Sequence, residues 1–107
     1  MSGISVSGFD TVLDALDYDV SGTAKYTVKA RAEYAVFVEF GSSRNQAQPF
    51  IRPAVEQTMR NIDTLIDDTA DSDEIARILA EDIADNSRGN APVDTGNLRD
   101  SITVEEQ

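Results

Sequence analysis

Cysteine and histidine are absent from this 107-residue sequence, and lysine occurs only at Lys25 and Lys29. Without cysteine the chain has no disulfide and no thiol chemistry, and without histidine the common catalytic triads cannot be built. The same two residue types are the usual ligands of transition metals. A glycine-rich phosphate loop is also missing. We therefore expect a protein that is not an enzyme and that holds no metal and no cofactor.

Long apolar runs are also lacking. No stretch approaches the ~20 apolar residues that cross a bilayer, so we expect no membrane partner. The opening Met-Ser-Gly does not lead into a basic segment followed by a long apolar one, which argues against a signal peptide. These absences predict a soluble protein of the cell interior or of a virion.

The formal net charge is −11, from thirteen Asp and seven Glu against seven Arg and two Lys. Free nucleic acid is an unsuitable partner for such a chain, because the phosphate backbone favours basic patches. The acidic surface could simply keep the protein soluble. We favour a second interpretation, a halophilic origin: at molar salt the Debye length falls to about 3 Å, so the repulsion between acidic side chains is screened.

Two acidic motifs could carry chemistry. Asp94-Thr95-Gly96 matches the tripeptide of dimeric aspartic proteases, but only eleven residues follow Gly96 and predicted helices precede it, so a turn is favoured. The acidic run from Asp67 to Glu74 lacks the glycine and the alternation of a calcium loop and indicates a helix linker. An acidic adaptor of the host cell is a further alternative function.

At this length we expect a single domain over residues 1–107, about 13 Å in radius of gyration. The patterns predict a small mixed or antiparallel sheet with two longer helices on one face, an α+β fold. Predicted strands cover residues 3–8, 26–32 and 98–104, and a short helix covers Phe9 to Leu16 with Asp19 to Thr23 as a loop. The two longer helices run from Pro53 to Ile66 and from an Asp71–Glu74 capping pair to Gly89.

The segment from Tyr34 to Ala54 holds four of the seven aromatic residues, which predicts that the core lies there. Its first part, YAVFVEF, fits a buried strand slightly better than two helical turns. Gly41 then permits a turn with positive φ, and Pro49 and Pro53 flank a helix start. Between them lies a polar loop that we expect to be the interaction loop: Gly41, Ser42, Ser43, Arg44, Asn45, Gln46, Ala47 and Gln48. Across it, Glu39 and Arg52 either form a bidentate pair or are both exposed.

Three segments carry a family resemblance. YAVFVEFGSS with QPFIRPA, the opening ISVSGFD, and APVDTGNLRDSI at residues 91–102 resemble the gene-product-ten-like tail-component family of tailed phages. In that family the APVDTG block precedes the YA…EFG block, whereas here it is relocated to the C-terminus. The matching signature residues are Tyr34, Glu39, Phe40, Gly41, Pro49, Phe50, Arg52, Pro53, Pro92, Asp94, Thr95, Gly96 and Leu98.

The resemblance implies a structural virion protein of the head–tail junction, a neck or tail-completion protein. It implies a homo-oligomeric ring, six- or twelve-fold, next to a neck connector or stopper and to a tail terminator or tail tube. DNA would only pass through the lumen of such a ring. With the acidic composition, the resemblance points to a haloarchaeal tailed virus.

Overall fold

The computed structural model describes residues 9–12, 15–20, 26–32, 34–66, 69, 71–92 and 96–106. Within them, one layer is an antiparallel sheet in the order β1-β2-β3-β4. Its strands are β1 (Phe9–Val12), β2 (Ala15–Val20), β3 (Tyr26–Ala30) and β4 (Ile102–Glu106). Strand β4 comes from the far end of the chain and pairs with β3. The predicted α+β fold is confirmed.

The predicted helix from Phe9 to Leu16 is wrong, because Phe9–Val12 form β1, and Ala15 and Leu16 begin β2. Strand pairing with residues farther along the chain outweighs the helical spacing of the apolar residues. Leu16 lies opposite Ala30 of β3, and Val20 lies opposite Tyr26. Leu16 and Val20 are thereby buried completely or almost so. Residues 19 and 20, predicted as loop, also belong to β2. The predicted strand at residues 3–8 lies outside the described residues.

The strand predicted at residues 26–32 is β3, which ends at Ala30. Tyr26, Val28 and Ala30 face the core as the alternation indicated. On the other face Thr27 is also buried and donates to Asp19 Oδ1 at 3.1 Å. Lys29 lies 3.4 Å from Glu105 and 3.7 Å from Asp17, so ion pairs join the neighbouring strands on this face.

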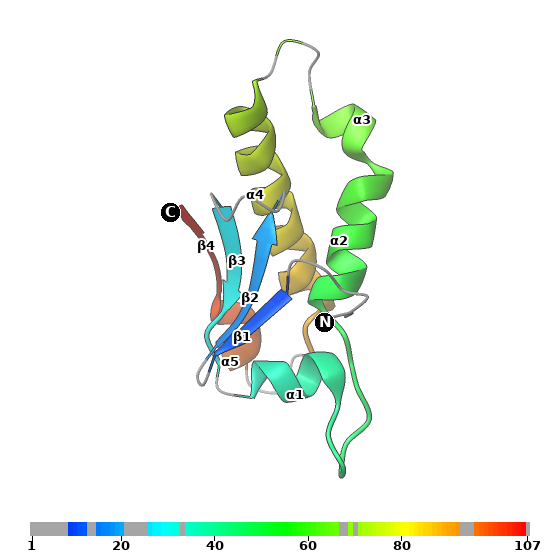
Figure 1. Cartoon of the computed structure of the whole chain (residues 1–107). Helices are drawn as coiled ribbons and strands as arrows, with labels where there is room; N and C mark the ends of the chain where they lie inside the picture. Colours follow the sequence, from blue (N-terminus) through cyan, green and yellow to red (C-terminus); the bar gives the residue numbers. More distant parts are fainter. Residues whose placement is uncertain are drawn as a thin grey trace.

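The helical layer consists of α2 (Ile51–Arg60), α3 (Ile62–Leu65) and α4 (Ser72–Asn90). Helices α2 and α4 lie side by side over one face of the sheet (Figure 1). Asp71 caps α4 as predicted, accepting from Glu74 N at 2.8 Å. Gly89 does not end this helix; α4 continues to Asn90 and stops before Pro92, which cannot continue it. The long helix predicted to end at Ile66 is interrupted at Asn61.

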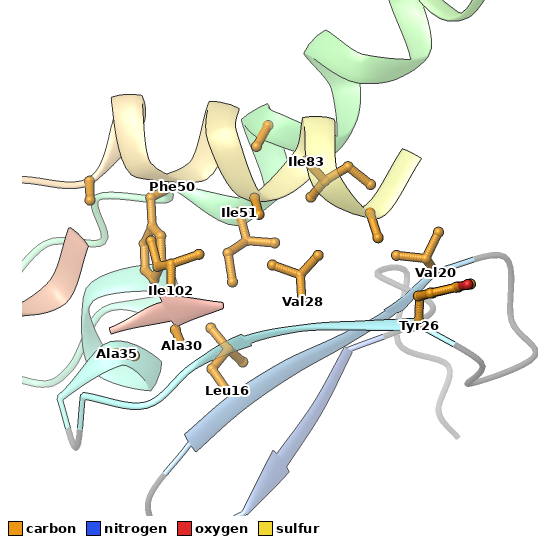
Figure 2. Packing of buried hydrophobic residues seen from close by; sticks show 14 of the residues in the cluster. Leu16, Val20, Tyr26, Val28, Ala30, Ala35, Phe50, Ile51, Ile83 and Ile102 are labelled. Atoms are coloured by element: carbon orange, nitrogen blue, oxygen red, sulfur yellow. The ribbon is translucent and has the colours of Figure 1, made fainter. Parts of the chain in front are cut away.

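The hydrophobic core lies between these two layers (Figure 2). Leu16, Val28 and Ala30 of the sheet meet Ile83 of α4 and Ile51 of α2, and all five are fully buried. The buried face of α4 is rich in small residues: Ala76, Leu79, Ala80, Ile83, Ala84 and Ser87. Small side chains on α4 allow neighbouring elements to approach closely, so α2 and α4 pack tightly against each other.

The segment Tyr34–Phe40 is not the favoured strand. Residues Ala35–Phe40 form a short helix, α1, and of these only Ala35 and Glu39 are buried. Gly41 ends α1 with a φ of 85°, which confirms the predicted turn.

The last predicted strand is also shifted. A short helix, α5 (Asn97–Asp100), follows Gly96, whose φ is 82°, and β4 begins only at Ile102. Leu98 is therefore buried from a helix rather than from a strand.

Candidate interaction surface

Glu39 is the buried charge around which this surface is built. It is 2% exposed, and its carboxylate accepts three backbone N–H groups at the start of α2. Oε1 lies 2.9 Å from Phe50 N and 2.8 Å from Ile51 N, and Oε2 lies 3.0 Å from Arg52 N. The first amides of a helix have no partner within it and carry the positive end of its dipole, so a carboxylate satisfies both needs. Helix α1 thus caps α2.

Neither of the two alternatives for Glu39 and Arg52 holds within the described residues: Glu39 is buried without an ion pair to Arg52, and the Arg52 side chain alone is exposed. Within the described residues Glu39 forms no ion pair with Arg52, whose side chain is exposed; it binds the backbone N–H of Arg52 instead. Charged partners were expected because a buried carboxylate needs compensation, and three oriented amides provide it equally well. The carboxylate of Glu39 therefore joins the two ends of the loop through backbone amides rather than through the Arg52 guanidinium.

The interaction loop, residues 41–48, is exposed over nearly its whole length. Gln48 N donates to Val38 O at 2.7 Å and Ser42 N to Asn45 O at 2.9 Å, so the loop is closed at its base and turned at its tip. Ser42 Oγ accepts from the amides of Arg44 and Asn45 at 3.2 and 3.1 Å. A polar loop with few side chains in the core, held at both ends, is suited to contact with another molecule.

Beside this loop lies a groove of about 610 Å³. One wall consists of Phe37 and Val38 of α1 together with its N-cap residue Tyr34, and the loop adds Asn45, Gln46 and Gln48. The opposite wall comes from the second signature: Pro92, Gly96, Asn97 and Leu98. The fold therefore joins two segments that are more than forty residues apart in the sequence into one surface.

The aromatic residues of α1 and of its N-cap are largely exposed and are not core residues; Tyr34 and Phe37 line the groove, and Phe40 does not. Tyr34 is 42% exposed, Phe37 59% and Phe40 41%, whereas Phe50 is fully buried. The prediction that the aromatic cluster marks the core is thus correct only for Phe50. The reason is local: on α1 the positions that face inward, four residues apart, hold Ala35 and Glu39. Neighbouring large apolar side chains on a surface indicate an interaction site.

Two further signature residues, Pro49 and Pro53, lie at the start of α2. Pro53 sits in the first turn of α2, where a proline needs no amide partner, and Pro49 is exposed just before it. Asp94 and Thr95 lie outside the described residues, so the structure gives no geometry for the Asp-Thr-Gly tripeptide. Phe37, Val38 and Asn97 were not singled out from the sequence. The clustering of aromatic residues between Tyr34 and Phe50 was the feature of the sequence that could have identified Phe37 as a surface residue of interest.

Two further observations concern other kinds of site. In the part of the chain that the structure describes, no three Asp or Glu side chains gather in a way that could hold a metal ion. Over the same residues, no helix combines the length and the apolar character needed to cross a membrane.

The fold and the groove define a small α+β protein with a candidate interaction surface, which Glu39 fixes to the start of α2. A family model matches residues 54–107, half of the chain; it is described as "Bacteriophage HK97-gp10, putative tail-component". The chain belongs to this family of phage tail components. The matched part contains α2 from Ala54 onward, all of α4, and the second signature at residues 91–102. No curated protein and no solved structure matches the chain.

Proposed function

We propose that this protein is a structural component of the head–tail junction of a tailed virus, where it forms a ring that joins the portal connector to the tail. The observation that carries the proposal is the exposed aromatic groove beside the 41–48 loop, in a chain of the tail-component family. A surface of this kind, fixed to α2 by Glu39, serves binding rather than catalysis.

The relocation of the APVDTG block is part of this proposal. Strand β4, which follows the block, pairs with β3, and Pro92 and Leu98 reach the groove beside α1. The relocated segment therefore lies where it can complete a surface together with the YAVFVEFGSS segment. We propose that the family's contacts are retained although the order of the two segments in the chain is changed.

The ring is six- or twelve-fold in this proposal, with a connector or stopper on one side and a tail terminator or tail tube on the other. The net charge of −11 supports two further features, a haloarchaeal host and an acidic lumen. Acidic side chains repel the phosphates of passing DNA, so the DNA does not adhere to the channel.

Deletion of the gene from the virus that encodes it tests the function. Cells infected with the deletion virus are expected to accumulate DNA-filled heads and separate tails, and the intact gene supplied from a plasmid should restore joined particles. A normal yield of joined, infectious particles from the deletion virus would contradict the proposal. Particles that lack tails altogether, with no free tails in the lysate, would also contradict it.

A further inference from the structure

The two walls of the groove come from different parts of the chain and meet at the end of the helical layer where α2 begins and α4 ends (Figure 1). Helix α1 and the 41–48 loop lead into the start of α2, whereas Pro92 and α5 follow the end of α4. The separation of the walls therefore depends on how the start of α2 is held against the end of α4.

The peptide unit between Phe50 and Ile51 is held from both of these sides. Its N–H, which belongs to Ile51, donates to Glu39 Oε1 of α1 at 2.8 Å. Its C=O, which belongs to Phe50, accepts from Asn90 Nδ2 at the last residue of α4, at 3.2 Å. The side chains of Phe50 and Ile51 are fully buried and fix the unit in the core. Because a peptide unit is planar and rigid, its two hydrogen bonds fix α1 relative to the end of α4.

Asn90 is well oriented for this contact. A side-chain amide has two N–H groups, and Asn90 Nδ2 also lies 3.2 Å from Gln57 Oε1, two turns into α2. Hydrogen bonds at the two ends of one peptide unit polarise each other, so the Glu39 carboxylate makes the Phe50 carbonyl a better acceptor for Asn90. The contact therefore joins the first wall to the residue that lies two positions before Pro92 of the second wall.

The second wall is tied to the same end of α4 by Arg88. Its Nε and Nη2 lie 3.2 and 2.9 Å from Ile102 O, and its Nη1 lies 2.7 Å from Asp85 Oδ1. Ser101, which follows α5, donates from Oγ to Leu98 O at 2.7 Å, so α5 is held close to this anchored carbonyl. The last turn of α4 thus carries one attachment for each wall.

We propose that the groove has a fixed width in the unbound protein, and that Asn90 is the positioning residue that sets it by joining the α1 wall to the end of α4. The inference rests on the proposed function only in that the groove is the binding surface named there. A surface that already has its final shape loses less conformational entropy on binding, so a partner binds without the groove opening or closing.

Double electron–electron resonance on the full chain measures the width. The sequence contains no cysteine, so two introduced cysteines can be spin-labelled selectively. Phe37→Cys on α1 with Asp100→Cys on α5, both exposed positions, measures the separation of the walls. Glu56→Cys with Glu81→Cys, at exposed positions of α2 and α4, measures the helix pair. An excess of unlabelled chain ensures that each distance lies within one molecule.

The groove distance should be narrowly distributed in the labelled protein. Asn90→Ala should broaden it and shift it to longer values, while the helix-pair distance stays unchanged. Asn90→Asp keeps the shape of the side chain but cannot donate when ionised; it should act in the same way, and it serves as the test if Asn90→Ala does not fold. Asn86→Ala is the matched control: Asn86, one turn earlier on α4, donates to Thr58 and Asp82, so its loss should leave the groove distance narrow.

A groove distance that stays narrow without the Asn90 amide would overturn the inference, as would a broad distribution before any further substitution. Equal broadening by Asn90→Ala and Asn86→Ala would also overturn it, because loosened helix packing would then be the cause. Far-UV circular dichroism verifies that each variant is folded. None of these results bears on the gene-deletion experiment: a protein required for head–tail joining whose groove opens on binding would retain the proposed function and lose this device.

Discussion

Glu39 connects the two halves of the interaction surface at the scale of single residues. It belongs to α1, which carries the exposed aromatics, and it holds the first amides of α2, which anchors the far end of the loop. A charge in this position is stable only because three oriented N–H groups replace its water. The conformation of the 41–48 loop therefore depends on a residue outside it.

Glu39→Ala should lower the free energy of unfolding by about 3 kcal/mol, because it leaves buried amides without an acceptor. Glu39→Gln should cost less, since the amide oxygen still accepts from one side. Urea denaturation measures both, and Glu56→Gln, at an exposed position of α2, is the control that should change little. An unchanged midpoint for Glu39→Ala would contradict the capping role.

Two glycines should respond in opposite directions to the same substitution. Gly41 has a φ of 85°, and a Cβ there would meet Ala47 N at 3.0 Å, so Gly41→Ala should destabilise the protein by about 1–2 kcal/mol. Gly89 lies within α4 and a Cβ there would meet nothing within 4 Å, so Gly89→Ala should stabilise by about 0.5–1 kcal/mol. Thermal unfolding of the two variants side by side measures the difference, and the same sign for both would contradict it.

Residue types predicted the surface only in part. The positions of Gly41 and Gly96 and the polar loop followed from the sequence, since positive φ and exposure depend on local chemistry. The exposure of Tyr34, Phe37 and Phe40 did not follow, because aromatic side chains are equally suited to a core and to an interface. Whether the aromatic side chains of this segment are buried or exposed depends on which face of α1 packs inward, and that face holds Ala35 and Glu39.

At the scale of elements, the two long helices were the most predictable parts. Their apolar periodicity is long and their caps are explicit, as at Asp71. The buried face of α2 could not be predicted from the apolar pattern. Thr58 is fully buried, whereas Met59, which belongs to the predicted apolar stripe, is 42% exposed. Thr58 donates to Asp82 at 2.7 Å and accepts from Asn86 at 3.1 Å, so a polar contact with α4 decides which face turns inward.

Strands β1 and β2 show the limit of local patterns. Phe9, Val12, Leu13 and Leu16 have helical spacing, yet Phe9 and Val12 lie in β1, which pairs with β2, and Leu16 lies in β2, which pairs with β3. Strand pairing stabilises a segment through contacts with residues outside it. The spacing of apolar residues within the segment contains no information about such contacts. The start of β4 at Ile102 was missed for a related reason, since Gly96 opens a helical turn first.

The N-cap of α4 gives a prediction at the scale of elements. Asp71→Ala should destabilise the protein by about 1 kcal/mol, because the amide of Glu74 loses its acceptor. Asp71→Asn keeps a side-chain oxygen in place and should be close to wild type. Guanidinium denaturation of both variants separates capping from charge, and equal losses would show that the negative charge is what matters.

At the scale of the whole molecule, the net charge of −11 is the dominant property. The acidic residues are unevenly placed: residues 63–85 include nine acidic residues and one basic, whereas residues 25–60 include six basic and three acidic. Repulsion within the acidic part opposes folding in dilute buffer and weakens as salt screens it.

Stability should therefore rise with KCl. Between about 0.1 and about 2 M KCl the screening length falls severalfold, and a gain of about 1 kcal/mol would raise the thermal midpoint by about 4–8 °C. Replacing five exposed acidic residues, Glu56, Asp63, Glu74, Glu81 and Asp85, by their amides changes the net charge from −11 to −6 and should flatten this dependence. Equal salt dependence in both proteins would contradict the electrostatic cause.

A cryo-electron microscopy map of the virion's head–tail junction tests the central claim most directly. We predict a ring of this chain between the portal connector and the tail. A junction in which every ring is accounted for by other proteins, with this chain absent from the particle, would contradict the account.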